Sequence, residues 1–114
     1  MSKRIDLVYL GDMLDAARRV AAKVDGKTIG DFQTDDNLQL AVVHLIQVIG
    51  ESASRVSAAI REENSTLPWD AVIGMRNRLV HDYGNVDYSI VWRVAVEEIP
   101  KLISVLAQIV PPSP

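Results

Sequence analysis

The sequence has no cysteine and only two histidines, His44 and His81, among its 114 residues. Without cysteine the chain cannot form disulfide bonds, use a thiol nucleophile, or bind zinc or an iron–sulfur cluster through thiolates. Two histidines are also too few for a histidine-rich metal centre. We therefore expect neither a bound metal nor a cofactor.

Aromatic residues are scarce as well, at 5% of the chain, whereas apolar residues make up 48%. Any core must therefore consist mainly of alanine, valine, leucine and isoleucine. No stretch reaches the roughly 18–20 uninterrupted apolar residues of a membrane span, and the N-terminal stretch turns acidic before a long apolar run develops. The sequence thus predicts a cytoplasmic protein without a membrane segment.

Basic residues are outnumbered by acidic residues, 12 against 15, which gives a formal net charge of −3. The overall field of the protein therefore does not favour a polyanionic partner. Any contact with a nucleic acid would have to depend on a local group of basic side chains.

Apolar residues recur at helical spacing in four stretches, and no stretch shows the sustained alternation of a β-strand. Helices are expected from Arg4 to Val24, from the cap Asp35-Asp36 to about Glu62, from Pro68 to near Gly84-Asn85, and from the cap Asp87 to Ile109. These lengths and short connections predict an all-α, four-helix antiparallel up-and-down bundle. It forms a single domain over residues 1–110, with a short Pro-rich tail at 111–114 and a kink at Pro100.

The third predicted helix carries the most unusual polar residues. On a continuous helix Arg76 lies near the centre of the apolar face, where a permanent charge needs an acidic partner, a cavity or a subunit interface. A snorkelling or structurally paired arginine is an equal alternative. His81 lies roughly 140° around the helix from Arg76. The two side chains converge only if the helix loosens near Gly84, if the arginine spans the gap, or if two protomers share a cleft.

Spacing alone gives the remaining polar residues ordinary roles. His81 is then a cap at the end of the helix dipole, and Asp82 and Tyr83 are surface residues beside it, although helical geometry also allows Tyr83 to be a packing residue. Trp69 and Trp92 are expected to pack in the interior.

Polar residues also share one face of the second predicted helix, namely Gln47, Glu51 and Arg55. Glu51 is either a counter-ion of Arg76 or part of an exposed polar face. Two apolar residues expected to be exposed, Val43 and Val48, flank this strip and favour a dimer. His44 on the same helix is expected to be solvated.

The run Arg76-Asn77-Arg78-Leu79-Val80-His81-Asp82-Tyr83 resembles the R-x4-H-x-Y signature of the HepT-like branch of the HEPN superfamily. Further similarities follow in the same order as in that family and extend the resemblance from the first helix to Leu106: Ile49-Gly50-Glu51 with Ala53, Leu67-Pro68-Trp69, Ile73-Gly74-Met75-Arg76-Asn77, and Val86-Asp87 through Val91-Trp92. The chain departs from the family at Gly84-Asn85, where an aromatic residue commonly precedes a glycine. This departure does not change the arginine, the histidine or the tyrosine of the signature.

The resemblance implies a homodimeric, metal-independent endoribonuclease, the toxin of a type VII-like HEPN–MNT toxin–antitoxin pair. It assigns Arg76 as a clamp for the RNA phosphate and His81 as a general acid or base, roles that suit a planar guanidinium and an imidazole. Asn77, Asp82 and Glu51 are supporting residues.

The resemblance also implies that Arg78 contributes positive charge for RNA binding. Tyr83 is the residue to which a cognate MNT-type nucleotidyltransferase antitoxin transfers AMP. Two alternatives remain at this point. One is a non-catalytic helical dimer that binds and regulates a nucleotidyltransferase or nucleic acid, and the other is a purely structural dimerisation domain.

Overall fold

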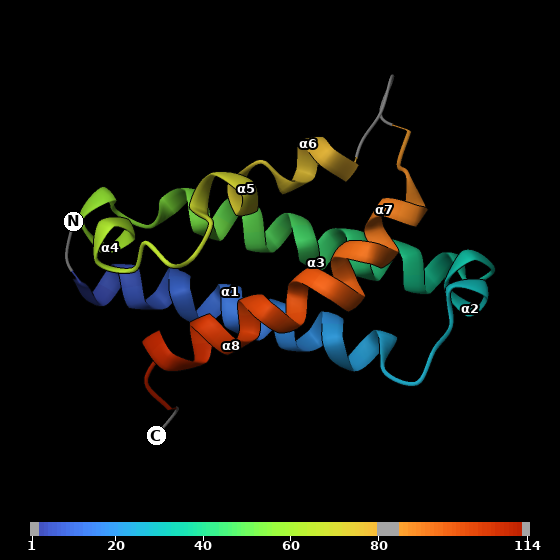
Figure 1. Cartoon of the computed structure of the whole chain (residues 1–114), viewed down its shortest axis with the longest axis horizontal. Coiled ribbons are helices and arrows are strands. Elements are labelled where there is room, and N and C mark those ends of the chain that lie inside the picture. Colours follow the sequence, from blue (N-terminus) through green and yellow to red (C-terminus); the bar gives the residue numbers. More distant parts are fainter. Residues whose placement is uncertain (1–2, 80–84, 113–114) are drawn as a thin grey trace.

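The computed structural model describes residues 3–79 and 85–112, and its regular structure over these ranges consists of helices (Figure 1). In chain order the helices are α1 Lys3–Val24, α2 Ile29–Gln33, α3 Asp36–Arg55, α4 Ala58–Glu63, α5 Trp69–Ile73, α6 Met75–Leu79, α7 Tyr88–Arg93, the π-helical turn η2 Val94–Glu98, and α8 Ile99–Ile109. The predicted all-α class is confirmed.

The two longest helices, α1 and α3, lie side by side along the long axis and run in opposite directions. Helix α8 packs against α1, and α5 and α6 pack against α3. Figure 1 shows that successive helical stretches run alternately up and down this axis. The segment that carries Arg76 is therefore attached to the body of the protein mainly through α3.

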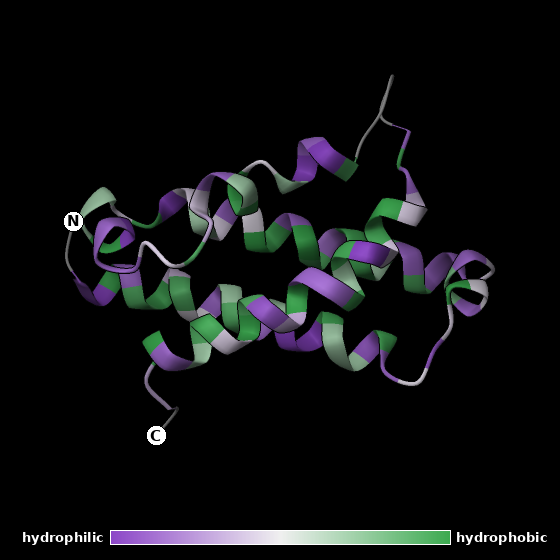
Figure 2. Ribbon diagram, in the orientation of Figure 1, coloured by the Kyte–Doolittle hydropathy of each residue, from purple (hydrophilic) through white to green (hydrophobic). Residues whose placement is uncertain are grey.

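The core between these helices is built from aliphatic side chains, as the composition predicts. Each long helix carries hydrophobic and hydrophilic residues along its length, as expected for amphipathic helices around one interior (Figure 2). Burying one large aliphatic side chain stabilises the fold by about 1.5–3 kcal/mol. Fully or nearly fully buried examples are Leu10, Met13, Val20, Val42, Ile46, Ile49, Leu102 and Leu106.

No helix within residues 3–79 and 85–112 is long and apolar enough to cross a membrane.

The connection after α1 contains a short helix that the periodicity does not reveal. Thr28 and Asp31 form a capping box, in which the Asp31 N–H donates to the Thr28 hydroxyl at 3.1 Å and the Thr28 N–H donates to the Asp31 carboxylate at 2.9 Å. This helix places Phe32 in the core, with its ring centroid 5.5 Å from that of Trp92. The connection between the first two predicted helices thus contains a helix, and the predicted packing role of Trp92 is confirmed.

The second predicted helix is broken near its C-terminal end, which corrects the expectation that it continues to Glu62. Helix α3 ends at Arg55, and Ser57 caps the separate helix α4. The carboxylate of Asp6 on α1 accepts hydrogen bonds from the Ser57 N–H at 2.9 Å and from its hydroxyl at 2.8 Å. Arg61 donates to carbonyls of the last turn of α3. A contact from another helix therefore decides where α3 ends.

Replacing Asp6 by alanine is expected to lower the free energy of unfolding more than the matched change Asp15→Ala on the same helix. The first change leaves two Ser57 donors without their acceptor at a side chain that is only 2% exposed. Asp15 is 66% exposed, and water screens its ion pair with Arg19. Urea unfolding at pH 7 measures the difference, and equal losses of stability for the two variants would contradict the role of Asp6.

The effect of Asp6 should also depend on pH. The hydrogen bonds from Ser57 lower the pKa of Asp6 in the folded state. Its stabilising contribution is therefore complete above the unfolded carboxyl pKa of about 3.9 and is lost as the pH falls from there through the folded-state pKa. The difference between wild type and Asp6→Ala should accordingly shrink when the same measurement is made near pH 3.

The third predicted helix is divided in two by Gly74. Pro68 occupies the N-cap position of α5, and Gly74 separates α5 from α6. The Gly74 N–H donates to the carbonyl of Asp70, and a β-carbon at Gly74 would lie only 3.1 Å from that oxygen. Trp69 is buried as predicted. The buried residues Val72, Met75 and Leu79 keep helical spacing across this break, and Arg76 lies beside them on α6.

The last helical stretch begins at the predicted cap. The Asp87 carboxylate accepts hydrogen bonds from the N–H groups of Ser89 and Ile90. Just before Pro100 the chain forms the π-helical turn η2, in which the Ile99 N–H donates to the carbonyl five residues back. Proline has no N–H of its own to donate, so a loosened turn at this position follows from its chemistry. The kink of the helix axis stays a prediction.

Candidate active site

The signature residues fall at the boundary of the described structure. Arg76, Asn77 and Arg78 lie on α6, whereas His81, Asp82 and Tyr83 lie outside the described residues, as does Gly84, the predicted helix stop. The described parts on either side are held together, because the Asp87 N–H donates to the carbonyl of Leu79 at 2.9 Å. The end of α6 and the start of α7 are thus joined directly.

Arg76 and Asn77 face solvent. Helix α6 is anchored by its two buried apolar side chains, Met75 and Leu79, and leaves the residues between them exposed. Within the described residues the Arg76 guanidinium makes no hydrogen bond or ion pair. The expectation that Arg76 lies near the centre of an apolar face is therefore wrong for the single chain, since its side chain is exposed beside the buried Met75 and Leu79. Its donors are available to an external ligand.

Arg78 is held by an acidic partner. Its two terminal nitrogens contact the two carboxylate oxygens of Glu98, with Nη1···Oε1 at 2.9 Å and Nη2···Oε2 at 2.8 Å. The hydrogen bonds between the two side chains, together with the attraction of their opposite charges, lower the pKa of Glu98 and raise that of Arg78. Periodicity and spacing do not reveal this pair, since its members lie on different helices.

Within the described residues, Glu51 on the polar strip of α3 forms no ion pair with Arg76. Glu51 and Arg55 are exposed, Gln47 is half-buried, and no ion pair of Glu51 is present among the described residues. Of the two alternatives for Glu51, the structure of the single chain agrees with an exposed polar face. The nearby His44 is exposed, as predicted.

The apolar residues expected to be exposed beside this strip are not. Val43 and Val48 are half-buried and pack against the core. The strongly exposed apolar side chains are Leu40, at 64%, and Val8, at 57%. Leu40 lies on the side of α3 opposite to the buried stripe that contains Leu38, Val42 and Leu45, which accounts for its exposure.

Metal-ligating side chains are dispersed over the described part of the chain. Across residues 3–79 and 85–112, no three His, Asp or Glu side chains lie close enough together to hold a metal ion. The groups present near α6 are instead a guanidinium and an amide, which bind oxyanions through N–H donors.

Comparison with protein families decides the class of protein. The model of the family described as "Ribonuclease HepT-like" matches residues 13–109. The chain belongs to the HepT-like ribonuclease family. The match spans every helix from the middle of α1 to the end of α8, which agrees with the extent of the resemblance seen in the sequence.

Individual HepT-like relatives show the same extent of similarity. A "Putative RNase" of Caldanaerobacter subterraneus subsp. tengcongensis is 35% identical over 94 residues, which is 82% of this chain and 84% of the relative. A "Putative RNase" of Methanocaldococcus jannaschii is 30% identical over 102 residues, 90% of this chain and 94% of the relative. A "Probable ribonuclease HepT" of Thermococcus cleftensis is 29% identical over 100 residues, 88% and 91% of the two chains. No solved structure gives a significant match.

For a HepT-like ribonuclease, the position of Arg76 has a direct chemical meaning. An arginine presents five N–H donors in a rigid, permanently charged fork that matches the oxygens of a phosphate. On α6 this fork is exposed, while the adjacent Asn77 offers a neutral amide. Within the described residues, Arg76 therefore presents an unpaired guanidinium whose N–H donors match the oxygens of a phosphate.

Proposed function

We propose that this HepT-like endoribonuclease cleaves RNA without a metal ion, with Arg76 binding the scissile phosphate and His81 transferring protons. The observation that carries the proposal is the exposed Arg76 guanidinium, which has no internal partner among the described residues. A buried or neutralised arginine could not receive a phosphate, whereas this one offers its full set of donors. The acidic net charge of the chain is compatible with RNA as a substrate because the positive charge at this site is local.

The proposed reaction uses the ribose itself as the nucleophile. A general base removes the proton of the 2′-hydroxyl, the 2′-oxygen attacks the adjacent phosphorus, and the bond from phosphorus to the 5′-oxygen breaks. A general acid gives a proton to the departing oxygen, so that the products are a 2′,3′-cyclic phosphate and a free 5′-hydroxyl. His81 supplies proton transfer, and Arg76 stabilises the charge that develops on the phosphoryl oxygens.

Supporting roles are assigned to neighbouring polar residues. Asn77 donates a hydrogen bond to the phosphate, and Asp82 biases the orientation of the imidazole. Glu51 is exposed on α3. We assign it to the border of the cleft that two protomers share in the proposed dimer. No organic cofactor has a part in this reaction.

The proposed active form is a homodimer in the cytoplasm. Each protomer is a four-helix up-and-down bundle whose last helix is kinked at Pro100. A single chain provides one His81, so one chain lacks the second histidine of an acid–base pair unless His44, exposed on α3, joins it. A cleft shared by two protomers contains two copies of His81 and of Arg76. It also doubles the local positive charge, which favours a polyanionic substrate.

Control of the nuclease is proposed to come from an MNT-type nucleotidyltransferase antitoxin in a type VII-like toxin–antitoxin pair. The partner transfers AMP to Tyr83: the phenolic oxygen attacks the α-phosphorus of ATP, pyrophosphate leaves, and the phenol loses its proton to solvent. The added phosphate brings a negative charge to the signature segment, where it competes with the RNA phosphate for Arg76.

The purified protein is expected to cleave a labelled single-stranded RNA in the presence of EDTA, because proton transfer and charge stabilisation come from side chains. The matched control is the same oligonucleotide with 2′-deoxyribose throughout, which lacks the nucleophile and should remain intact. Gel analysis of the products and of their cyclic phosphate ends measures both. RNA binding without cleavage would instead support a non-catalytic dimer that binds and regulates its partners.

A further inference from the structure

Helix α6, which carries Arg76, is held in place by few apolar contacts. It has five residues, of which Met75 and Leu79 are buried, and it packs against α3, α5 and α7. Such a short helix has little stability of its own, so its position depends on tertiary contacts. Whatever fixes α6 also fixes the backbone from which Arg76 projects.

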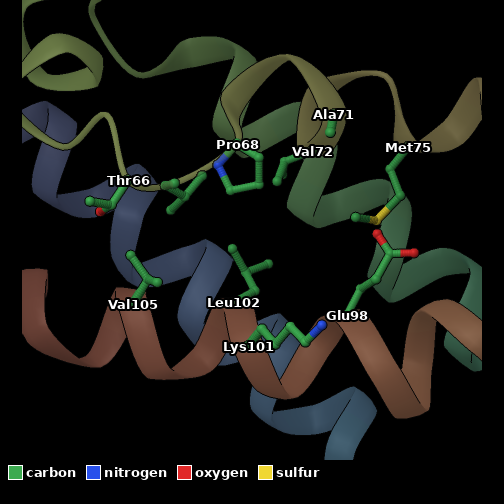
Figure 3. A pocket seen from close by; sticks show the side chains of 10 residues that line it. Thr66, Pro68, Ala71, Val72, Met75, Glu98, Lys101, Leu102 and Val105 are labelled. Atoms are coloured by element: carbon green, nitrogen blue, oxygen red, sulfur yellow. The ribbon is translucent and has the colours of Figure 1, made fainter.

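The flank of this region that faces η2 and α8 is not closely packed. A cavity of about 390 Å³ separates the α5–α6 side from α8. Figure 3 shows side chains from the two sides facing each other across it. Apolar side chains that line the cavity are Leu67, Val72, Met75, Leu102 and Val105. Apolar packing between α6 and α8 is therefore incomplete on this flank, although α6 contacts α7 at its C-terminal end.

An ion pair connects the two sides where apolar packing is incomplete. Arg78 of α6 and Glu98 of η2 form two parallel hydrogen bonds, of 2.9 and 2.8 Å, and their side chains are 43% and 35% exposed. Within the described residues it is the one ion pair that joins two helices, since Arg19 and Asp15 both belong to α1. In Figure 3 the Glu98 side chain extends from the C-terminal helical stretch toward Met75.

The π-helical turn sets the direction of Glu98. Within η2 the Ile99 N–H reaches back five residues to the carbonyl of Val94. A π turn accommodates one more residue than an α turn, which shifts the face on which the following residues lie by roughly 100°. Pro100 follows directly and provides no N–H that would favour the tighter α spacing. The local sequence thus supports the backbone geometry from which Glu98 reaches α6.

We propose that Arg78 and Glu98 are a positioning pair that holds α6, and with it Arg76, in the orientation needed for cleavage. This inference rests on the proposed function, and it gives Arg78 a role different from the RNA contact that the resemblance implies. Arg78 lies two residues after Arg76 on the same short helix. A contact that holds Arg78 in place therefore also limits the movement of the backbone at Arg76. Because misplacing a catalytic group by about 1 Å can cost about 100-fold in rate, a modest contact can have a large kinetic effect.

Two conservative variants test the pair through kinetics. Arg78→Lys keeps the positive charge but cannot form the bidentate contact, and Glu98→Gln removes the acceptor charge. Each is expected to lower kcat for RNA about tenfold while KM changes less than about twofold. The matched controls are Arg19→Lys, in an ion pair within one helix, and Glu97→Gln, an exposed carboxylate next to Glu98. Both controls should retain the wild-type kcat.

The same variants separate positioning from direct RNA binding. If Arg78 bound the substrate, Glu98→Gln would release it and lower KM, and Arg78→Lys would act mainly on KM and its salt dependence. That pattern overturns the inference. The exchanged pair, Arg78→Glu combined with Glu98→Arg, restores kcat at least in part if the contact matters, whereas no recovery over the single variants counts against it.

Amide hydrogen exchange gives a readout that does not depend on activity. The amides of residues 75–79 should lose protection in Glu98→Gln and keep it in Glu97→Gln, because only the first variant breaks the tether. Unchanged protection in Glu98→Gln overturns the inference even if the enzyme is active. If the wild-type protein cleaves no RNA, the proposed function fails, and the exchange data still decide whether the pair holds α6.

Discussion

Replacing Arg76 by alanine is expected to reduce RNA cleavage by about 10²–10³-fold. The variant loses the donors that stabilise charge on the phosphoryl oxygens, while the fold loses little, since the side chain is exposed and has no internal partner in the described residues. His81→Ala is expected to cause a loss of about 10²–10⁴-fold, because it removes proton transfer. Rates are measured on a labelled RNA with EDTA under single-turnover conditions.

The controls distinguish a loss of chemistry from a loss of structure. Arg18→Ala removes another exposed arginine, on α1, and should leave the rate close to that of the wild type. The helical circular dichroism signal and the sedimentation coefficient of the dimer should be the same for all variants. Cleavage that persists in both Arg76→Ala and His81→Ala would assign the activity to another site or to a contaminating nuclease.

Local signals in the sequence predicted the helix starts well. Asp35 and Asp87 were expected as caps, and both accept hydrogen bonds from N–H groups of the first helical turn. A cap acts over two or three residues, so its chemistry can be recognised in the sequence itself. The aliphatic stripes of the long helices were predictable for the same reason, because they depend only on spacing.

The helix breaks could not be predicted, because distant contacts cause them. The end of α3 depends on Asp6, which lies 51 residues before Ser57, and the apolar periodicity continues across the break. At Gly50 a β-carbon would lie 3.3 Å from the carbonyl of Val72, so α5 lies close to α3 at this point. Such an approach is a property of the packed chain and leaves no local pattern.

The candidate site shows the same division between local and distant information. The resemblance in the sequence pointed to the signature residues; the match over residues 13–109 confirms the family, and the roles of those residues stay predictions. Helical periodicity, however, placed Arg76 near the centre of an apolar face, whereas its side chain is exposed between the buried Met75 and Leu79. The partner of Arg78 could not be found either, since Glu98 lies 20 residues later and reaches it from a π-helical turn.

Co-expression with the cognate MNT-type nucleotidyltransferase is expected to convert most of the protein to a form that carries AMP on Tyr83. The modification adds bulk and a negatively charged phosphate within seven residues of Arg76, so it should block RNA by steric exclusion and by charge. Cleavage by the modified protein should fall to the level of Arg76→Ala. Intact-mass and fragment analysis identify the modified residue, and the RNA assay measures the inhibition.

Two tyrosine variants decide whether Tyr83 is the switch. Tyr83→Phe removes the accepting hydroxyl and should remain unmodified and active in the presence of the partner. Tyr88→Phe is the matched control, since Tyr88 is half-buried against Phe32 and should not affect the transfer of AMP. If the partner neutralises the Tyr83→Phe variant as efficiently as the wild type, control depends on complex formation, and Tyr83 is instead a packing residue.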